Sequence, residues 1–193
     1  MAGGPSLGFA CRCGQLRGEI VDAAPAAFTH AICHCGDCRS AYTHLGQADP
    51  GAVDILQTTQ DRIHIAQGGE QLRVFRHTPR GALRWYAGCC DTSLFYTPLK
   101  PRLAHVSVNA DRLDEPSAAG KVQAEGFIPA PDGRTRHKGA LRMVARMASR
   151  ILVANLSGAW RRTPFFGPDG EPARPPHVLT REQRAEALSA LRR

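Results

Sequence analysis

Apolar and polar residues alternate in short segments along the first 110 residues, a pattern typical of half-buried β-strands. In segment 15–21, Leu16 and Ile20 share one face of the predicted strand, and Arg17 and Glu19 share the other. Similar segments between turn residues predict strands over 8–13, 28–34, 52–56, 62–67, 72–77, 82–87, 93–97 and 103–109. Gly and Pro separate many of these segments, so the pattern predicts an all-β core of antiparallel sheets.

Helical spacing appears in the last third of the chain. Residues 138–155 repeat apolar side chains at intervals of three and four, which predicts an amphipathic helix. Arg142, Arg146 and Arg150 form a ladder on a neighbouring face, where like charges cost a few tenths of a kcal/mol unless an acidic group faces them. Thr180-Arg-Glu-Gln183 matches a capping box and predicts a second helix directly after it.

Two other segments have a weaker pattern. Residues 117–131 are small and irregular, which predicts a linker between the β-rich part and the helices. Residues 37–44 predict one or two helical turns between two strands.

The charge is distributed unevenly, and this bears on partners. The chain has a formal net charge of +8, of which residues 1–133 contribute −1 and residues 134–193 contribute +9. A basic third permits an acidic partner such as nucleic acid, or is simply a solvated arginine-rich surface. No aromatic residues alternate with the arginines of the ladder, which argues against a groove for single-stranded nucleic acid.

The composition of the chain bears on its class and on its cellular compartment. With 42% hydrophobic and 22% charged residues, the chain is typical of a soluble globular protein. No apolar run approaches the roughly 20 residues that cross a membrane, and the N-terminal residues lack the pattern of a signal peptide. We therefore expect a cytoplasmic protein without membrane contact, in which cysteines stay reduced and bind metal.

The seven cysteines form three clusters in the sequence: Cys11 and Cys13; Cys33, Cys35 and Cys38; Cys89 and Cys90. Thiolates are preferred ligands of zinc. One grouping uses every thiol: the first and last pairs close a four-cysteine structural site, and the triplet remains as a second site. Successive strand residues point to opposite faces, so Cys89 and Cys90 reach one ion only if the backbone turns there.

The triplet has the motif C-x-C-x-x-C, which favours a metal site, and we expect Gly36 to supply its tight turn. Three thiolates leave one ligand position for a small thiol, which zinc would convert to the nucleophilic thiolate. Such a site suits addition of a thiol to a small electrophile, or the reverse cleavage of a carbon–sulfur bond. His34 and Asp37 can move protons there or merely orient the loop.

Two points stay open at the triplet. It becomes a second structural site if a histidine supplies the fourth ligand, with the candidates His30, His34 and His44. A substrate carboxylate needs a cationic partner, for which the candidates are Arg39, Arg17 and Arg84.

These motifs, in this order, resemble the glutathione-dependent formaldehyde-activating enzyme family, or S-(hydroxymethyl)glutathione synthase, whose domain is shared with centromere protein V. The family pattern C-x-C-G corresponds to 11–14, C-x-C-x-x-C-R to 33–39, and an aromatic followed by C-x-x-C-G-T to 84–92. The resemblance covers about residues 8–110. It implies a β-rich zinc fold of the Mss4-like superfamily, with structural zinc at the outer cysteine pairs and catalytic zinc at the triplet. It also implies the condensation of formaldehyde with glutathione, classed as a carbon–sulfur lyase reaction.

The third motif differs from the family pattern. When Cys90-Asp91-Thr92 is aligned with C-G-T, the earlier cysteine of the pattern falls at Ala87, and Cys89 lies two residues later. Either Cys89 replaces it through an altered backbone, or the structural site has three thiolates. Asp91 also replaces the glycine of the turn.

We therefore predict a mainly β fold of antiparallel sheets joined by zinc, Mss4-like (β-tent), with a helical C-terminal extension. Residues 1–133 form the zinc-binding β domain, and 134–193 form a basic extension packed on or linked to it. The predicted function is that of a carbon–sulfur lyase-like enzyme acting on a small, glutathione-like thiol adduct. Zinc is bound at Cys11, Cys13, Cys89 and Cys90, and reactive zinc at Cys33, Cys35 and Cys38. The alternative is a non-catalytic binding module whose basic helices contact nucleic acid or an acidic protein.

Overall fold

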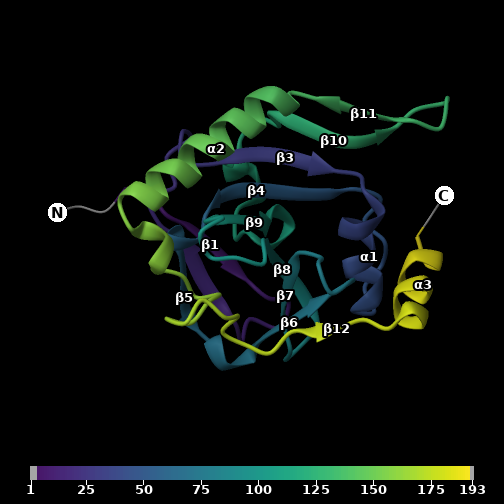
Figure 1. The fold of residues 1–193 in the computed structure, drawn as a ribbon, viewed down its shortest axis with the longest axis horizontal. Coiled ribbons are helices and arrows are strands. Elements are labelled where there is room, and N and C mark those ends of the chain that lie inside the picture. The colour runs from purple at the N-terminus through teal and green to yellow at the C-terminus, as the bar shows by residue number, and fades with distance from the viewer. Residues whose placement is uncertain (1–3, 192–193) are drawn as a thin grey trace.

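The computed structural model describes residues 4–191, which form two β-sheets and three α-helices (Figure 1). The strands are β1 (Leu7–Ala10), β2 (Arg17–Ile20), β3 (Thr29–Cys33), β4 (Val53–Thr59), β5 (Ile63–Gln67), β6 (Leu72–Arg76), β7 (Leu83–Ala87), β8 (Thr92–Thr97), β9 (His105–Asn109), β10 (Ala124–Pro129), β11 (Thr135–Lys138) and β12 (His177–Val178). The helices are α1 (Gly36–His44), α2 (Ala140–Leu156) and α3 (Arg181–Ser189). The prediction of a mainly β protein with a C-terminal helical region is confirmed.

The strands form one small sheet and one large sheet. The small sheet has the order β1-β2-β5 and is antiparallel throughout. The large sheet has nine strands in the order β11-β10-β3-β4-β9-β8-β7-β6-β12. It is mixed, because β10 pairs in parallel with β3 and β12 pairs in parallel with β6. The expectation of purely antiparallel sheets is therefore wrong for these two pairs, which join strands far apart in the sequence.

The main core includes inward side chains from both sheets. Phe9 of the small sheet contacts Phe95 of the large sheet edge to face, with 5.1 Å between ring centroids. Trp85 is also fully buried in this core. A second apolar cluster contains Tyr42 of α1 together with Phe75 of the large sheet. Successive side chains of the large sheet point alternately to its two faces, so one face contributes to the main core and the other to the second cluster.

The predicted linker 117–131 contains a strand instead. Strand β10 lies beside β3 and then forms a hairpin with β11, although Phe127 has a positive φ of 59° and the register shifts beside it. The predicted boundary at residue 133 falls in the turn of this hairpin. The division into two domains stays a prediction.

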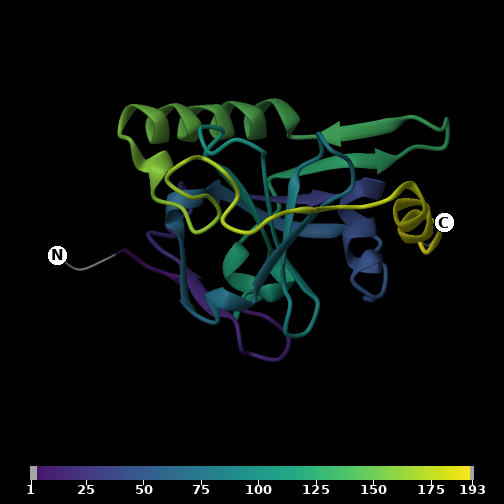
Figure 2. The same cartoon turned by 60° about the horizontal axis from the view of Figure 1, so that its bottom comes forward.

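Helix α2 lies alongside the large sheet, next to the β10–β11 hairpin (Figure 2). Its orientation is unusual for an amphipathic helix. Leu141 and Leu156 are 90% and 80% exposed, whereas Arg146 and Arg150 face the protein and are partly buried. Gln123, just before β10, and Thr29, at the start of β3, accept hydrogen bonds from Arg146 and Arg150, which accounts for this choice of face.

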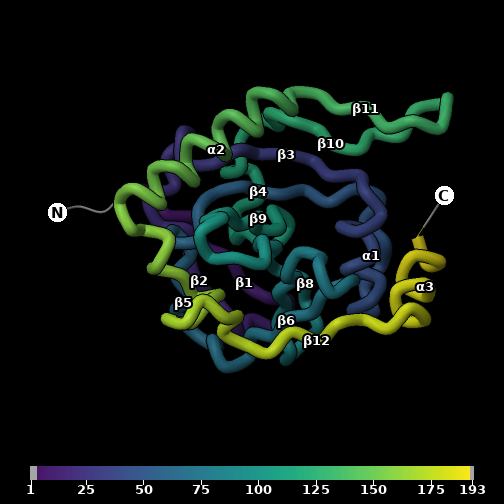
Figure 3. The backbone as a smooth tube through the Cα atoms, in the orientation of Figure 1, coloured from purple at the N-terminus to yellow at the C-terminus, as the bar shows by residue number. Residues whose placement is uncertain are grey.

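After α2 the chain passes the ends of β5 and β6 and places α3 beside α1 (Figure 3). Phe165, in this connecting segment, is fully buried against Trp85 and Phe95. The predicted capping box is confirmed, since Thr180 and Gln183 exchange both hydrogen bonds at the start of α3. Over residues 4–191, no helix has both the length and the apolarity that crossing a bilayer requires.

Candidate metal centres

The outer cysteine pairs meet, as the sequence grouping predicts. Cys11 and Cys13 lie in the loop after β1, and Cys89 and Cys90 lie in the turn between β7 and β8. Their four sulfur atoms all lie within 4.8 Å of one another. The Sγ atoms of Cys11, Cys13 and Cys89 are separated by 3.4–3.8 Å.

These distances fit a tetrahedral zinc site. Zinc–sulfur bonds of about 2.3 Å in a tetrahedron place the sulfur atoms about 3.8 Å apart. The Leu16 amide lies 3.3 Å from Cys11 Sγ and donates a hydrogen bond to it, an interaction that orients and stabilises a thiolate ligand. The four residues can therefore hold a metal ion with no open position, linking the small sheet to the β7–β8 turn.

A tight turn brings adjacent cysteines to the same side. Asp91 adopts a left-handed conformation with φ of 51°, which suits the glycine that it replaces. The amide of Cys90 donates to the Ala87 carbonyl at 3.3 Å, which closes the turn. This is the altered backbone that allows both Cys89 and Cys90 to face the first pair. Gly14, with φ of 74°, likewise adopts the left-handed conformation in the first loop.

The triplet forms a second, separate group of donors. Cys33 ends β3, Cys35 caps the N-terminus of α1, and Cys38 lies in its first turn. The three sulfur atoms lie within 4.8 Å of one another, with 3.3 Å between those of Cys33 and Cys35. The Cys38 amide donates to Cys35 Sγ at 3.4 Å. Helix capping, not a left-handed glycine, thus shapes this loop.

The expectation that Gly36 supplies the tight turn of the triplet loop is wrong. Gly36 begins α1 and is not among the glycines with positive φ. A Cβ atom at this position would lie 3.4 Å from the side chain of Leu188. The small residue therefore lets α3 pack closely against the start of α1, directly beside the triplet.

The triplet holds three thiols and no described His, Asp or Glu as a fourth donor. His30 lies between Asp54 and the Gly120 carbonyl, and His44 packs against the ring of Phe75. His34 Nε2 lies 3.6 Å from a carboxylate oxygen of Glu125. The alternative with a histidine ligand thus finds no support over residues 4–191.

Hydrogen bonds between the thiols distribute their protons unequally. The pKa of Cys35 is lowered mainly because Cys33 and Cys38 donate to its thiolate, with help from the charge of Arg84. The pKa of Cys33 is raised because its proton is held in the bond to Cys35. Three close thiols therefore ionise fully only with a cation among them, which is the behaviour of a metal site.

A buried polar network adjoins the triplet. Arg84 of β7 is 6% exposed, and its guanidinium lies 4.9 Å above the centre of the Tyr96 ring. Arg84 Nε donates to His77 Nδ1 at 2.6 Å, and His77 Nε2 lies 3.1 Å from Ser40 Oγ. Arginine only donates, so His77 accepts at Nδ1 and carries its proton on Nε2, directed at Ser40. The sequence suggested Arg84 as a candidate but gave no sign of His77 or Ser40.

The other two candidate arginines, Arg39 and Arg17, have different hydrogen-bond partners. Arg39 forms a salt bridge with the buried carboxylate of Asp49. Arg17 donates to the Gly14 carbonyl at 2.8 Å, beside the four-cysteine group. The charge of Arg84 acts on Cys35 and Cys38 of the triplet, and Arg39 also interacts electrostatically with Cys35.

Asp37, the other proton-transfer candidate, faces the C-terminal helix. Its carboxylate lies 3.4 Å from the guanidinium of Arg184 in α3. Arg84, Asp37 and Arg184 all act electrostatically on His77. The polar surroundings of the triplet therefore come from three elements: the start of α1, strand β7 and helix α3.

Comparison with known proteins places the chain in a family. A solved structure of a Rhodobacter sphaeroides protein, a structural genomics target, is 20% identical with a TM-score of 0.41, and the match covers 60% of this chain and 96% of that one. A search of curated proteins found no match. The resemblance to formaldehyde-activating enzymes is not confirmed by these matches. The sequence profile of a family of unknown function, DUF6151, matches residues 5–147, which include all seven cysteines. The chain belongs to this DUF6151 family.

Proposed function

We propose that the protein is a zinc-dependent carbon–sulfur lyase-like enzyme that acts on the adduct of a small, glutathione-like thiol and formaldehyde. The observation that carries this proposal is a three-thiol group with no fourth donor from the described chain, beside a buried arginine. The separate four-thiol group supports it, because four thiols can hold a structural ion with no open position and leave the triplet for chemistry. The order of the cysteine motifs supports the link to formaldehyde-activating enzymes and the Mss4-like fold.

Cys33, Cys35 and Cys38 would hold the metal at the reactive site. When bound, zinc favours the thiolate form of a thiol at neutral pH, which is the form that reacts with carbonyl carbon. Cys11, Cys13, Cys89 and Cys90 would hold the structural ion. Their role is to fix the turn between β7 and β8, and β7 carries Arg84.

Arg84 supplies the fixed positive charge of the site. Three thiolates leave an excess negative charge around a divalent ion, and a nearby guanidinium offsets it. The bond to His77 and the stack on Tyr96 hold this guanidinium in one place. Because Arg84 is almost fully buried, its function here is to stabilise charge and not to capture a distant substrate carboxylate.

The reaction conserves atoms and electrons without a further reactant. In the cleavage direction, the carbon–sulfur bond of the hydroxymethyl thioether breaks and its electron pair stays on sulfur. The hydroxyl loses its proton as the carbon–oxygen double bond forms, giving formaldehyde and the thiolate. Condensation is the reverse. His34 and Asp37 follow or precede the ligand cysteines in sequence, and we assign one of them to carry the hydroxyl proton.

Exchange spectroscopy and metal analysis test this function together. The purified protein should increase the rate, measured by NMR, at which formaldehyde and glutathione exchange with their adduct. Cys35→Ser should abolish this increase and remove one metal ion per chain while the fold, followed by circular dichroism, is retained. Cys38→Ser provides a second variant of the same group.

Two outcomes would contradict the proposal. A wild-type protein with both metal sites filled that leaves the exchange rate unchanged is not this enzyme. A chain that unfolds whenever either triplet cysteine is replaced holds a structural ion there instead.

The binding-module alternative has less support. It relies on the arginine ladder of α2 for contact with an acidic partner. Arg146 donates to the Gln123 side chain at 2.7 Å, and Arg150 donates to Thr29 at 3.0 Å. Two of the three ladder arginines therefore face the protein and are engaged there.

A further inference from the structure

A pocket of about 640 Å³ lies between α2 and the large sheet, at the start of β3. Triplet residue Cys33 ends the same strand, so the pocket and the triplet lie at its opposite ends. The pocket has an apolar part, which includes Ala27 and Val153, and a cationic part. Its volume is that of a site for a small organic molecule.

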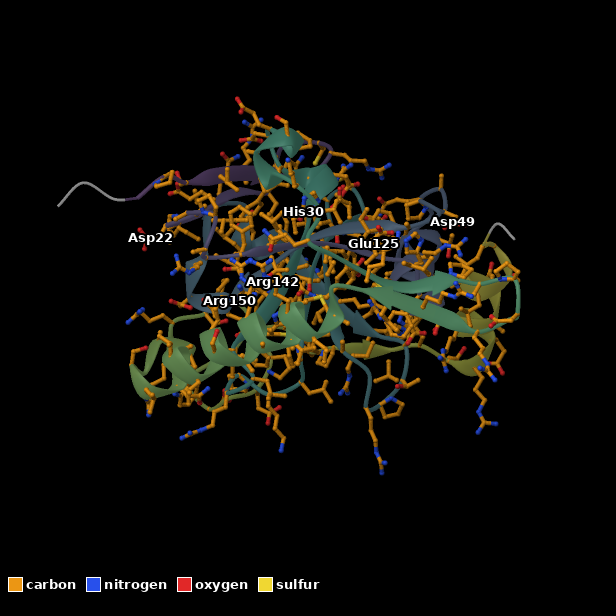
Figure 4. The ribbon with its side chains drawn as sticks, turned by 90° about the horizontal axis from the view of Figure 1, so that it is seen from above. Asp22, His30, Asp49, Glu125, Arg142 and Arg150 are labelled. Atoms are coloured by element: carbon orange, nitrogen blue, oxygen red, sulfur yellow. The ribbon has the colours of Figure 1, made fainter. Side chains whose placement is uncertain are left out.

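Three arginines line the cationic part: Arg62, Arg150 and Arg162. Arg62 donates to the backbone carbonyl of Asp22 at 2.7 Å. Arg150 Nη2 donates to Thr29 Oγ1, while its Nη1 is buried and has no hydrogen-bond partner. Figure 4 shows Arg150 on α2, on the side of the helix that faces the sheet.

Among the described residues, two of these three arginines have no carboxylate partner, whereas Arg162 pairs with Asp61. Within residues 4–191, neither Arg62 nor Arg150 takes part in an ion pair, and the same holds for Arg146, one turn before Arg150. Burial and the charges of Arg146 and Arg62 lower the pKa of Arg150 to about 10. A cluster of like charges of this kind is unfavourable unless an anion joins it.

Two acidic residues also line the pocket and narrow the choice of ligand. Asp61 lies 3.8 Å from Arg162, and its other carboxylate oxygen is buried without a partner. The carboxylate of Asp22 lies 3.3 Å from the amide of Gly4 and accepts its hydrogen bond. The pocket therefore suits a ligand with one compact anionic group, placed near Arg150, whose other part is apolar. It does not suit a polyanion.

We propose that this pocket binds a small organic anion, a carboxylate or phosphate with an apolar group, through Arg150 and Arg62. The anionic group accepts hydrogen bonds from the arginines, and the apolar group packs on Ala27 and Val153. The site provides a partner for Arg150 Nη1, the buried atom that the hydrogen bond of Arg150 to Thr29 leaves unpaired. It is independent of the proposed lyase activity.

Calorimetric titration of the full chain with phenyl phosphate, at constant ionic strength, tests the proposal. Inorganic phosphate serves as the probe without an apolar group and should bind more weakly. Arg150→Gln should weaken phenyl phosphate binding about tenfold or more, since it removes a charge-assisted bond. Arg142→Gln is the matched control on the same helix. This ladder residue is exposed and outside the pocket lining, so its replacement should change affinity less than about twofold.

Val153→Glu is a second variant that avoids the buried arginine. Val153 is 63% exposed at the pocket rim, so the fold should tolerate the change, and the added charge should repel the anion. No measurable binding by the wild type would overturn the proposal. Equal losses of phenyl phosphate affinity in Arg150→Gln and Arg142→Gln would also overturn it, because they would indicate only a general attraction of the anion to a basic helix.

Discussion

Replacing Phe165 tests whether the segment that follows α2 contributes to the main core. Its side chain is fully buried, with ring centroids 5.1 Å from Trp85 and 5.3 Å from Phe95. Phe165→Ala removes a buried ring and leaves a cavity between these aromatics, for which the expected loss is about 3–5 kcal/mol. For a chain of this size, that loss lowers the melting temperature by about 6–20 °C.

Thermal unfolding followed by circular dichroism measures this loss, with metal content determined on the same samples. Leu156→Ala is the matched control, because Leu156 lies in the same part of the chain and is 80% exposed. It should change the free energy of unfolding by less than about 0.5 kcal/mol. A Phe165→Ala protein that melts within about 2 °C of the wild type would refute the reasoning, since it would mean that the segment contributes little to the core.

Three further measurements address the metal groups and their surroundings. Cys11→Ser should remove one metal ion per chain and destabilise the fold, because Cys11 is a buried member of the four-thiol group; unchanged metal content would argue against this site. Asp91→Gly should leave the fold unchanged or stabilise it by up to about 1 kcal/mol, since glycine adopts the left-handed conformation without strain, and a clear loss in chemical denaturation would contradict this. The pKa of His77 is lowered to about 4, first by burial and then by the charge of Arg84. The unfolded chain therefore binds a proton between about pH 6.5 and 4 that the folded chain does not, so stability should fall as the pH drops through this range. The melting temperature of His77→Gln should depend less on pH than that of the wild type. An equal pH dependence in the two proteins would exclude His77 as a source of the loss of stability at low pH.

The strands were predictable where alternation was regular. Ile63 and Ile65 share one face of β5, and Leu72 and Val74 share one face of β6, which leaves a clear period of two in these strands. Strand β10 carries Gly126 and a bulge beside Phe127, and β12 has only two residues, so neither leaves such a pattern. Parallel pairing depends on a distant partner strand, which local spacing does not reveal.

The cysteine groups were predictable because few arrangements use every thiol. The residues that surround these groups could not be predicted in the same way. Arg84, His77 and Ser40 come from β7, the loop after β6 and α1, and a polar residue within a strand pattern suggests exposure. The same limit applies to α2. Periodicity predicted the helix, but the acceptors on Thr29 and Gln123 decided that its arginines face the sheet.

The order in which the large sheet is completed has a consequence for synthesis. Strand β3 pairs on one side with β10, about ninety residues later, and β6 pairs with β12, about a hundred residues later. Until residue 178 has left the ribosome, β6 keeps an open edge of unpaired backbone groups. The nascent chain thus exposes strands that can pair with other chains until β12 has been synthesised. Chaperone dependence and losses to aggregation during expression should therefore depend on the C-terminal third, which supplies the strand that covers this edge.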